Sequence, residues 1–381
     1  MNAGRWGSQV TSRLGQGLGR WMLLCAPLFT LSPVLADAPP ADVATARRML
    51  KQGQVAQAQA VLEELAAGEP DAEVHRLLGD VYCRQRQWDE AREELRAAIR
   101  MDEIADDHLR LGEVYIAEHK YALALAQFRN ARRMGVLDGD LHYRLALAYF
   151  GLGRIYGDVQ RVSLPSGSPG QRVGDTVLIE EIPGEPGMYW AAATDSAAFQ
   201  VTRARSLGAD GPEVRLLEAR TWLAGRQYAL AGRCFDALVE DLPNLELTDE
   251  ERRQAWTDAA EASYHADDLV GFIARWREAH RTQDRDALAA AMAEAHRRVA
   301  ERYADRGDLP QCIAHLEQAL AEAPRDVPLR YQLGNRYWEA GEPLKAARAW
   351  RIVLQLDPEH PDRARILDRL QVITAEYGSS E

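Results

Sequence analysis

The chain has 381 residues, of which 46% are hydrophobic and 27% are charged. Its 58 Asp and Glu residues outnumber its 46 Lys and Arg residues, and the formal net charge of −12 argues against nucleic acid or anionic lipid as a partner. This length could hold two or three ordinary domains, so the internal pattern decides whether the chain is built from domains or from repeats.

The first 36 residues have the pattern of a secretory signal peptide. Arg5, Arg13 and Arg20 precede an uncharged apolar run over Trp21–Leu35. This run is shorter than the roughly 20 apolar residues of a membrane-spanning helix. We therefore expect residues 1–36 to be cleaved on export to the periplasm, with an uncleaved membrane anchor as the alternative.

A recurring spacing begins beyond this segment. Three related runs read LLGDVY, RLGEVY and QLGNRY, at Leu77–Tyr82, Arg110–Tyr115 and Gln332–Tyr337. Nine residues after each Tyr comes an alanine, and four residues later a large apolar side chain: Ala91 and Leu95, Ala124 and Phe128, Ala346 and Trp350. This pattern resembles the tetratricopeptide repeat, a helix-turn-helix unit of about 34 residues. The resemblance implies an all-α superhelix, because a single unit cannot bury its apolar face and must stack on neighbours.

The units follow one another in chain order. A degenerate first unit over about Pro39–Glu69 precedes clean units over Ala72–Ile104 and Ala105–Asp138, and a fourth unit begins near Gly139. After an interruption, the pattern continues with Pro212–Asn244, an irregular unit over about Thr248–Gln283, a unit around Ala300–Pro324 and the last unit, Val327–His360. We expect about eight helix pairs over residues 37–360, followed by a capping helix and tail over residues 361–381.

The interruption lies inside the fourth unit. Its register resumes at FQVTRARSLGADGPE, which parallels AQFRNARRMGVLDGD of the unit before. We therefore expect residues 154–187 to be an insertion between two helices, and Tyr189–Leu207 to be the displaced second helix. The insertion contains DVQRVSL and QRVGDTVLIEEI around the turn-rich PSGSPG, a pattern typical of a β-hairpin.

The resemblance also implies a concave groove lined by the first helix of each unit. Residues at i, i+4 and i+7 form one stripe on each of these helices. The candidate partner-binding residues on the stripe are Leu109, Ile116, Tyr143, Leu147, Phe150, Leu216, Arg220, Leu223, Tyr331, Asn335 and Trp338.

The middle of this stripe is apolar and allows two interpretations. The large side chains of Tyr143 and Phe150 could anchor a partner helix or an extended partner segment. Alternatively, the inserted hairpin could fold back and cover the groove with its own apolar residues, Val177, Leu178, Ile179 and Ile182. A grip on a partner's C-terminal carboxylate is not expected, because Tyr331 replaces the cation that such members of the family carry near Asn335.

Three histidines recur at one position of successive units: His75, His108 and His142. Neighbouring units about 10 Å apart hold the imidazoles too far from one another to share a zinc ion at about 2.1 Å. We interpret them as half-buried rings at repeat interfaces, and we expect no metal or other cofactor.

These patterns predict a non-enzymatic scaffold that binds a protein or peptide partner in the bacterial envelope, for the assembly or export of an envelope component. One alternative is a membrane-tethered scaffold with an uncleaved anchor. The other is an accessory enzyme subunit with carboxylate chemistry in the insertion, which contains no His, Cys or Lys. The carboxylates of the insertion are Asp158, Asp175, Glu180, Glu181 and Glu185.

Overall fold

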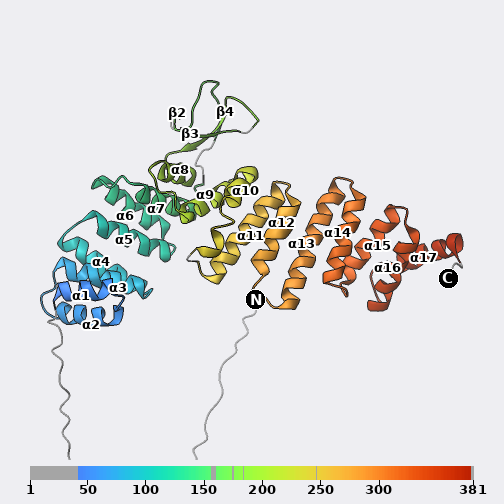
Figure 1. Ribbon diagram of the computed structural model, residues 1–381, viewed down its shortest axis with the longest axis horizontal. Helices are drawn as coiled ribbons and strands as arrows, with labels where there is room; N and C mark the ends of the chain where they lie inside the picture. The colour runs from blue at the N-terminus through green and yellow to red at the C-terminus, as the bar shows by residue number, and fades with distance from the viewer. Residues whose placement is uncertain (1–41, 156–159, 174–175, 183, 246, 379–381) are drawn as a thin grey trace, which may run out of the picture.

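The computed structural model describes residues 42–155, 160–173, 176–182, 184–245 and 247–378. In these residues the chain forms a row of antiparallel helix pairs that lie side by side from the N-terminal to the C-terminal end of an elongated array (Figure 1). The expected signal peptide lies outside the described residues. Among the described residues, no helix is both long enough and apolar enough to cross a membrane.

We call the first helix of each pair the A helix and the second the B helix. The pairs are α1 (Val43–Lys51) with α2 (Val55–Ala66), α3 (Ala72–Arg84) with α4 (Trp88–Met101), α5 (Ala105–Ala117) with α6 (Tyr121–Arg133), α7 (Gly139–Gly151) with α8 (Ala197–Ser206), α9 (Pro212–Ala224) with α10 (Tyr228–Asp236), α11 (Asp249–His265) with α12 (Leu269–His280), α13 (Arg285–Asp305) with α14 (Leu309–Glu322), and α15 (Val327–Glu339) with α16 (Pro343–Leu356). A short 3₁₀ turn, η1 (Leu242–Asn244), follows α10, and α17 (Arg363–Tyr377) ends the array. The predicted all-α repeat architecture is therefore confirmed.

The two helices of a pair pack through one recurrent contact between a small and a large residue. A Cβ added to Gly79 would lie 2.8 Å from Leu95 Cγ, and one added to Gly334 would lie 2.5 Å from Trp350 Nε1. Leu95 and Trp350 are fully buried. The large residue of the B helix thus fills the space that the missing side chain of the A helix leaves open.

Every turn between an A helix and its B helix is closed in the same way. One residue adopts a left-handed conformation, with φ between 59° and 76°, at Gly53, Arg86, His119, Gly153, Arg226, Asp267, Gly307 and Gly341. The next residue then accepts a backbone hydrogen bond from the first turn of the B helix, as Lys120 does from Ala124 over 3.1 Å.

The insertion differs from its prediction. It forms a four-stranded antiparallel sheet in the order β1-β4-β3-β2, not a simple hairpin. The strands are β1 (Gln160–Ser163), β2 (Arg172–Val173), β3 (Thr176–Glu181) and β4 (Met188–Ala193). The helix expected from Tyr189 begins only at Ala197, because Met188–Ala193 pairs with β1 on one side and with β3 on the other.

The fourth repeat keeps the geometry of the others around this sheet. Ala197 donates to the carbonyl of Arg154 over 2.9 Å, which is the same bond that Ala124 makes to Lys120. His142 lies 2.7 Å from Gln200, as His108 does from Gln127, although these partners are 58 and 19 residues apart. The chain therefore inserts 39 residues into the turn without changing how α7 packs on α8.

The sheet sits on the B-helix side of the array, above α8 in Figure 1. One face packs against the core of α8 to α10 through Ile179 and Ala192. The other face forms a small core of its own from Leu178, Tyr189 and Ala191. The hydroxyl of Tyr189 donates to the carbonyl of Gly167 over 2.6 Å, which holds the PSGSPG loop over this second core.

The last helix covers the end of the array, as predicted. Ile366 and Ile373 of α17 are buried against the core of the last repeats. Arg369 lies above the rings of Trp338 and Trp350, with its guanidinium carbon 5.4 Å and 5.2 Å from their centroids. The helix therefore shields the apolar surface that a further repeat would otherwise bury.

Candidate functional site

The candidate residues predicted from the sequence all lie on A helices. Leu109 and Ile116 are on α5, Tyr143, Leu147 and Phe150 on α7, Leu216, Arg220 and Leu223 on α9, and Tyr331, Asn335 and Trp338 on α15. All are half-buried except Leu216, which is 5% exposed and belongs to the core of α9 to α11. Leu216 therefore offers no surface to a partner.

Ion pairs between successive A helices occupy many polar positions of this face. Arg144 of α7 donates to Glu113 of α5 over 2.6 Å, and Arg220 of α9 donates to Asp258 of α11 over 2.7 Å. Further along, Arg298 of α13 forms a two-pronged pair with Glu261 of α11 at 2.7 and 2.9 Å. These side chains hold neighbouring repeats together and are engaged within the protein.

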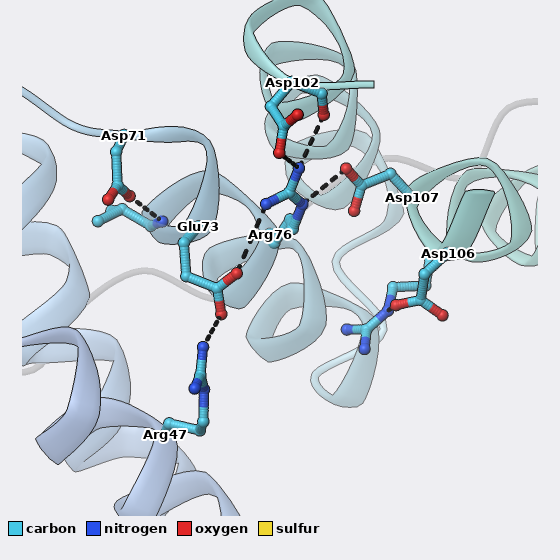
Figure 2. Close-up of polar contacts among 9 residues, drawn as sticks. Arg47, Asp71, Glu73, Arg76, Asp102, Asp106 and Asp107 are labelled. Carbon is cyan, nitrogen blue, oxygen red and sulfur yellow. Dashed lines mark hydrogen bonds and ion pairs between the residues drawn. The ribbon is translucent and has the colours of Figure 1, made fainter. Parts of the chain in front are cut away.

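The most buried of these contacts centres on Arg76 of α3. Figure 2 shows its guanidinium between Asp102 and Asp107, with hydrogen bonds of 2.7 and 2.8 Å. Asp107 is fully buried at a position that Leu141 and Leu329 occupy in other repeats. Burial raises the pKa of the Asp107 carboxyl, although Arg76 acts in the opposite direction. This buried pair fixes the third repeat on the second.

Two hollows lie along the A-helix face in the middle of the array. The smaller, of about 290 Å³, is lined by Glu113 and Ile116 of α5, Phe128 of α6, and Asp140, Tyr143, Arg144 and Leu147 of α7. The larger, of about 560 Å³, is lined by Phe150 of α7, Arg220, Leu223 and Ala224 of α9, and Glu250, Glu251, Gln254 and Asp258 of α11. The apolar parts of both hollows come mostly from residues that the stripe predicted.

The sequence did not predict the α11 wall of the larger hollow. Helix α11 belongs to the sixth unit, whose repeat pattern is irregular, so the predicted stripe has no residue on it. One signal was present, since Thr248 and Glu251 have the spacing of a capping box and the structure contains that box. Hydrogen bonds from Thr248 and the positive charges of Arg86 and Arg220 lower the pKa of Glu251.

The inserted sheet does not cover these hollows. Its apolar residues Leu178 and Ile179 are buried in the sheet or against α8 to α10, and no described residue of the insertion lines either hollow. Two of its carboxylates are engaged locally: Glu185 pairs with Arg161, and Glu181 accepts a hydrogen bond from the backbone of Gly187 over 2.7 Å. Asp158 and Asp175 lie outside the described residues.

The C-terminal part of the predicted stripe is partly covered by the end of the chain. The ring of Tyr331 lies 4.8 Å from that of His360. Asn335 accepts a hydrogen bond from Arg369 of α17 over 3.3 Å, and the same Arg369 covers Trp338. Asn335 also lines a hollow of about 230 Å³ with Gln332 of α15 and Glu301 of α13, and the two hollows described above lie on the A helices of the third to sixth repeats.

The three recurrent histidines each bond to the B helix of their own repeat. His75 lies 2.6 Å from Glu94, His108 2.7 Å from Gln127, and His142 2.7 Å from Gln200. No group of three or more His, Cys, Asp or Glu residues in the described ranges could hold a metal ion.

Comparison with known proteins agrees with this geometry. A family model described as tetratricopeptide repeat matches residues 43–106 and 109–155. The sequence has no match among curated proteins.

Several solved structures are similar at low identity. The APC/C hetero-tetramer Cut9-Hcn1 is 12% identical with a TM-score of 0.42; the match covers 86% of this chain and 48% of that one, so the chain spans about half its length. A tetratricopeptide repeat protein from Parabacteroides merdae is 13% identical, over 79% of this chain and 98% of that one, with a TM-score of 0.39. YrrB, described as a TPR protein with an unusual peptide-binding site, is 13% identical, over 80% and 96%, with a TM-score of 0.28.

The family match covers the helices from α1 to α7, and the same small-to-large contact recurs as far as Gly334 and Trp350. Residues 43–106 and 109–155 thus match the tetratricopeptide repeat family, and the helix pairs that follow them repeat the same architecture.

Proposed function

We propose that this protein is a non-enzymatic scaffold that binds a segment of a protein partner across the A helices α5, α7, α9 and α11. The observation that carries this proposal is the pair of hollows on either side of α7. Tyr143 and Leu147 line one hollow and Phe150 lines the other. Half-buried aromatic and aliphatic side chains in such depressions are the usual anchors of a binding surface.

The polar surroundings fit a segment that is mainly apolar. The ion pairs Arg144–Glu113 and Arg220–Asp258 use some of the polar side chains that border the hollows. The other polar side chains there are Asp140, Glu250, Glu251 and Gln254. A partner therefore gains most binding free energy by placing large apolar side chains against Ile116, Leu147 and Leu223. Apolar burial supplies the affinity, and the borders of the hollows restrict which side chains fit.

Replacement of Tyr143 and Phe150 by Ala tests the site. We expect the double variant to lose about 2 kcal/mol of binding free energy, or roughly 30-fold in affinity, for the partner that the wild-type protein captures. Both side chains also pack against the core of α8 and α9, so the unfolding midpoint must be measured in parallel. Leu145→Ala is the control: Leu145 is 1% exposed, so this change lowers stability without touching either hollow.

Site-specific crosslinking identifies the partner independently of mutation. A photo-reactive residue at Leu147 or Leu223 is expected to capture the same partner. The same residue at Leu123, which is 46% exposed on α6, is expected to capture none. Equal capture from all three positions, or normal affinity of the Tyr143→Ala/Phe150→Ala variant, would remove the hollows as the binding site.

We further propose that the scaffold works in the bacterial envelope, in the assembly or export of an envelope component, after removal of residues 1–36. The support is the charge and apolar pattern of the N-terminal sequence. N-terminal sequencing of the protein from a periplasmic fraction is expected to begin at Asp37. Recovery of the intact N-terminus in the membrane fraction would favour the anchored form instead.

A further inference from the structure

A second exposed surface lies at the carboxyl ends of three consecutive B helices. The same repeat position carries Met101 at the end of α4, Met134 after α6 and Leu207 after α8, with exposed fractions of 55%, 44% and 39%. The corresponding residues of the first, fifth, sixth and seventh repeats are Gly68, Asp241, Thr282 and Glu322. Leu137, in the loop after α6, adds a side chain that is 64% exposed. These side chains recur at one position of three consecutive repeats, and exposed apolar patches commonly mark a contact surface.

The part of this surface on α6 and α8 is rich in arginine, although Asp138 lies in the loop after α6 and Asp210 in the loop after α8. Helices α6 and α8 contain five arginines and no Asp or Glu. Arg205 is paired with Asp210 and Glu218. The other four form no ion pair with the residues that the structure describes: Arg129, Arg132, Arg133 and Arg203. All four side chains are exposed.

The ends of α6 and α8 come together in space. A Cβ added to Gly139, at the start of α7, would lie 2.7 Å from Ala209 Cβ and 2.9 Å from the carbonyl oxygen of Ala204. The loop after α6 therefore lies beside the last turn of α8. His142 lies near arginines of both helices: burial lowers its pKa, and the charges of Arg203 and Arg132 lower it further.

We infer that this α6–α8 edge, formed by Arg129, Arg132, Arg133, Met134, Leu137, Arg203 and Leu207, binds an acidic segment of a second protein. Carboxylates of that segment pair with the four arginines, and its apolar side chains cover Met134, Leu137 and Leu207. Charge complementarity selects the partner and speeds its approach, and apolar contact holds it. The edge belongs to B helices and their following loops, so it can be occupied together with the A-helix hollows.

Binding of a synthetic peptide tests this inference directly. The probe is a fluorescein-labelled amphipathic peptide of Glu and Leu, and its control has Gln in place of every Glu. Anisotropy with the full chain is expected to show binding of the Glu peptide that weakens with added salt. The Arg132→Glu/Arg203→Glu variant should raise its dissociation constant at least about 10-fold, and Met134→Ser should raise it as well.

The last repeat supplies matched control variants. Arg351 and Leu356 of α16 occupy the repeat positions of Arg129 and Met134 and are also exposed, Leu356 by 42%. Arg351→Glu and Leu356→Ser should therefore leave the dissociation constant unchanged. The Tyr143→Ala/Phe150→Ala variant should also bind the peptide normally, which separates the edge from the site proposed above.

Several results would overturn the inference. These are failure of the Glu peptide to bind, equal binding of the Gln peptide, and equal losses in the edge and control variants. Loss of peptide binding in the Tyr143→Ala/Phe150→Ala variant would place the peptide in the hollows. Binding of phosphatidylglycerol vesicles that Arg132→Glu/Arg203→Glu abolishes, without an effect on the peptide, would make the edge a membrane surface instead.

Discussion

At the scale of single residues, the left-handed backbone conformation in the turn of each repeat costs conformational free energy for every residue type except glycine. Glycine occupies this position in four repeats, whereas Arg86, His119, Arg226 and Asp267 occupy it in the others. A side chain in this conformation costs roughly 1 to 2 kcal/mol relative to glycine. The identity of this residue therefore tunes the stability of each repeat without changing its packing.

Gly307→Ala isolates this backbone cost. The φ of Gly307 is +75°, and a Cβ there would meet no atom within 4 Å, so only the backbone conformation disfavours alanine. We expect a loss of about 1 kcal/mol in the free energy of unfolding, measured by chemical denaturation. Gly232→Ala in α10 is the matched control, because its Cβ also meets nothing within 4 Å and its φ is not left-handed. It should gain up to about 1 kcal/mol. Equal effects of the two changes would contradict this explanation.

At the scale of the helix pair, one polar contact recurs between a histidine of the A helix and the residue 19 positions later on the B helix. In the fourth repeat the insertion lengthens this separation to 58 residues. The partner is a carboxylate or an amide in the second, third and fourth repeats. In the seventh repeat it is a second histidine, with His296 Nδ1 3.1 Å from His315 Nδ1. Two imidazoles this close cannot both be protonated without strong repulsion.

The seventh repeat should therefore be sensitive to acid. Burial, His315 and Arg277 lower the pKa of His296 to about 4, below its ordinary value of 6.5. Below pH 6.5 the unfolded chain takes up a proton that the folded chain refuses. The contribution of His296 to the free energy of unfolding is thus complete above pH 6.5. It decreases as the pH falls towards about 4, by up to about 3 kcal/mol.

His315→Gln tests this source of acid sensitivity, because it restores the partner found at Gln127 and Gln200. We expect the variant to lose less of its free energy of unfolding between pH 6.5 and pH 4. Chemical denaturation at several pH values measures this loss. Stability near pH 7.5, where both histidines are neutral, should change little. If the free energy of unfolding of this variant decreased as much below pH 6.5 as that of the wild type, other titratable groups would control the acid sensitivity.

At the scale of the whole molecule, the array tolerates a folded insertion because the turn that carries it remains closed. The backbone hydrogen bond from Ala197 to the carbonyl of Arg154 closes the turn at the base of the sheet. The other repeats make the same hydrogen bond across a much shorter connection. The sheet in turn covers apolar surface of α8 to α10 through Ile179, Trp190 and Ala192. The insertion is therefore tied to the array at its base and along one face.

Deletion of residues 155–193 joins Arg154 to Thr194 and gives this turn the length of the turn at Lys120 and Tyr121. We expect the helices to form, with a loss on the order of 3 kcal/mol for the apolar side chains no longer buried. Circular dichroism, denaturation and binding of an apolar dye measure these effects, and partner binding in the hollows should persist. Loss of the His142–Gln200 contact, detected by NMR, would show instead that α7 and α8 need the sheet to pair.

The sequence by itself determined the repeat architecture, its register and the cap, because these depend on contacts between residues at fixed spacing. The packing of Phe128 on Gly112 is such a contact. The bond of a histidine to the B helix is another, with Gln127 in the third repeat and the aligned Gln200 in the fourth. The apolar residues around α7 could also be chosen from the sequence, since their positions follow the helical period.

Only the tertiary structure decided the features that depend on residues far apart in the chain. Met188–Ala193 became a strand because β1 and β3 offer it hydrogen bonds on both sides, which its local sequence does not reveal. Leu216 is buried by neighbouring repeats, and Arg369 covers Asn335 and Trp338 from the last helix. A helical period identifies the face on which a residue lies, but the packing of other elements determines whether that face remains open.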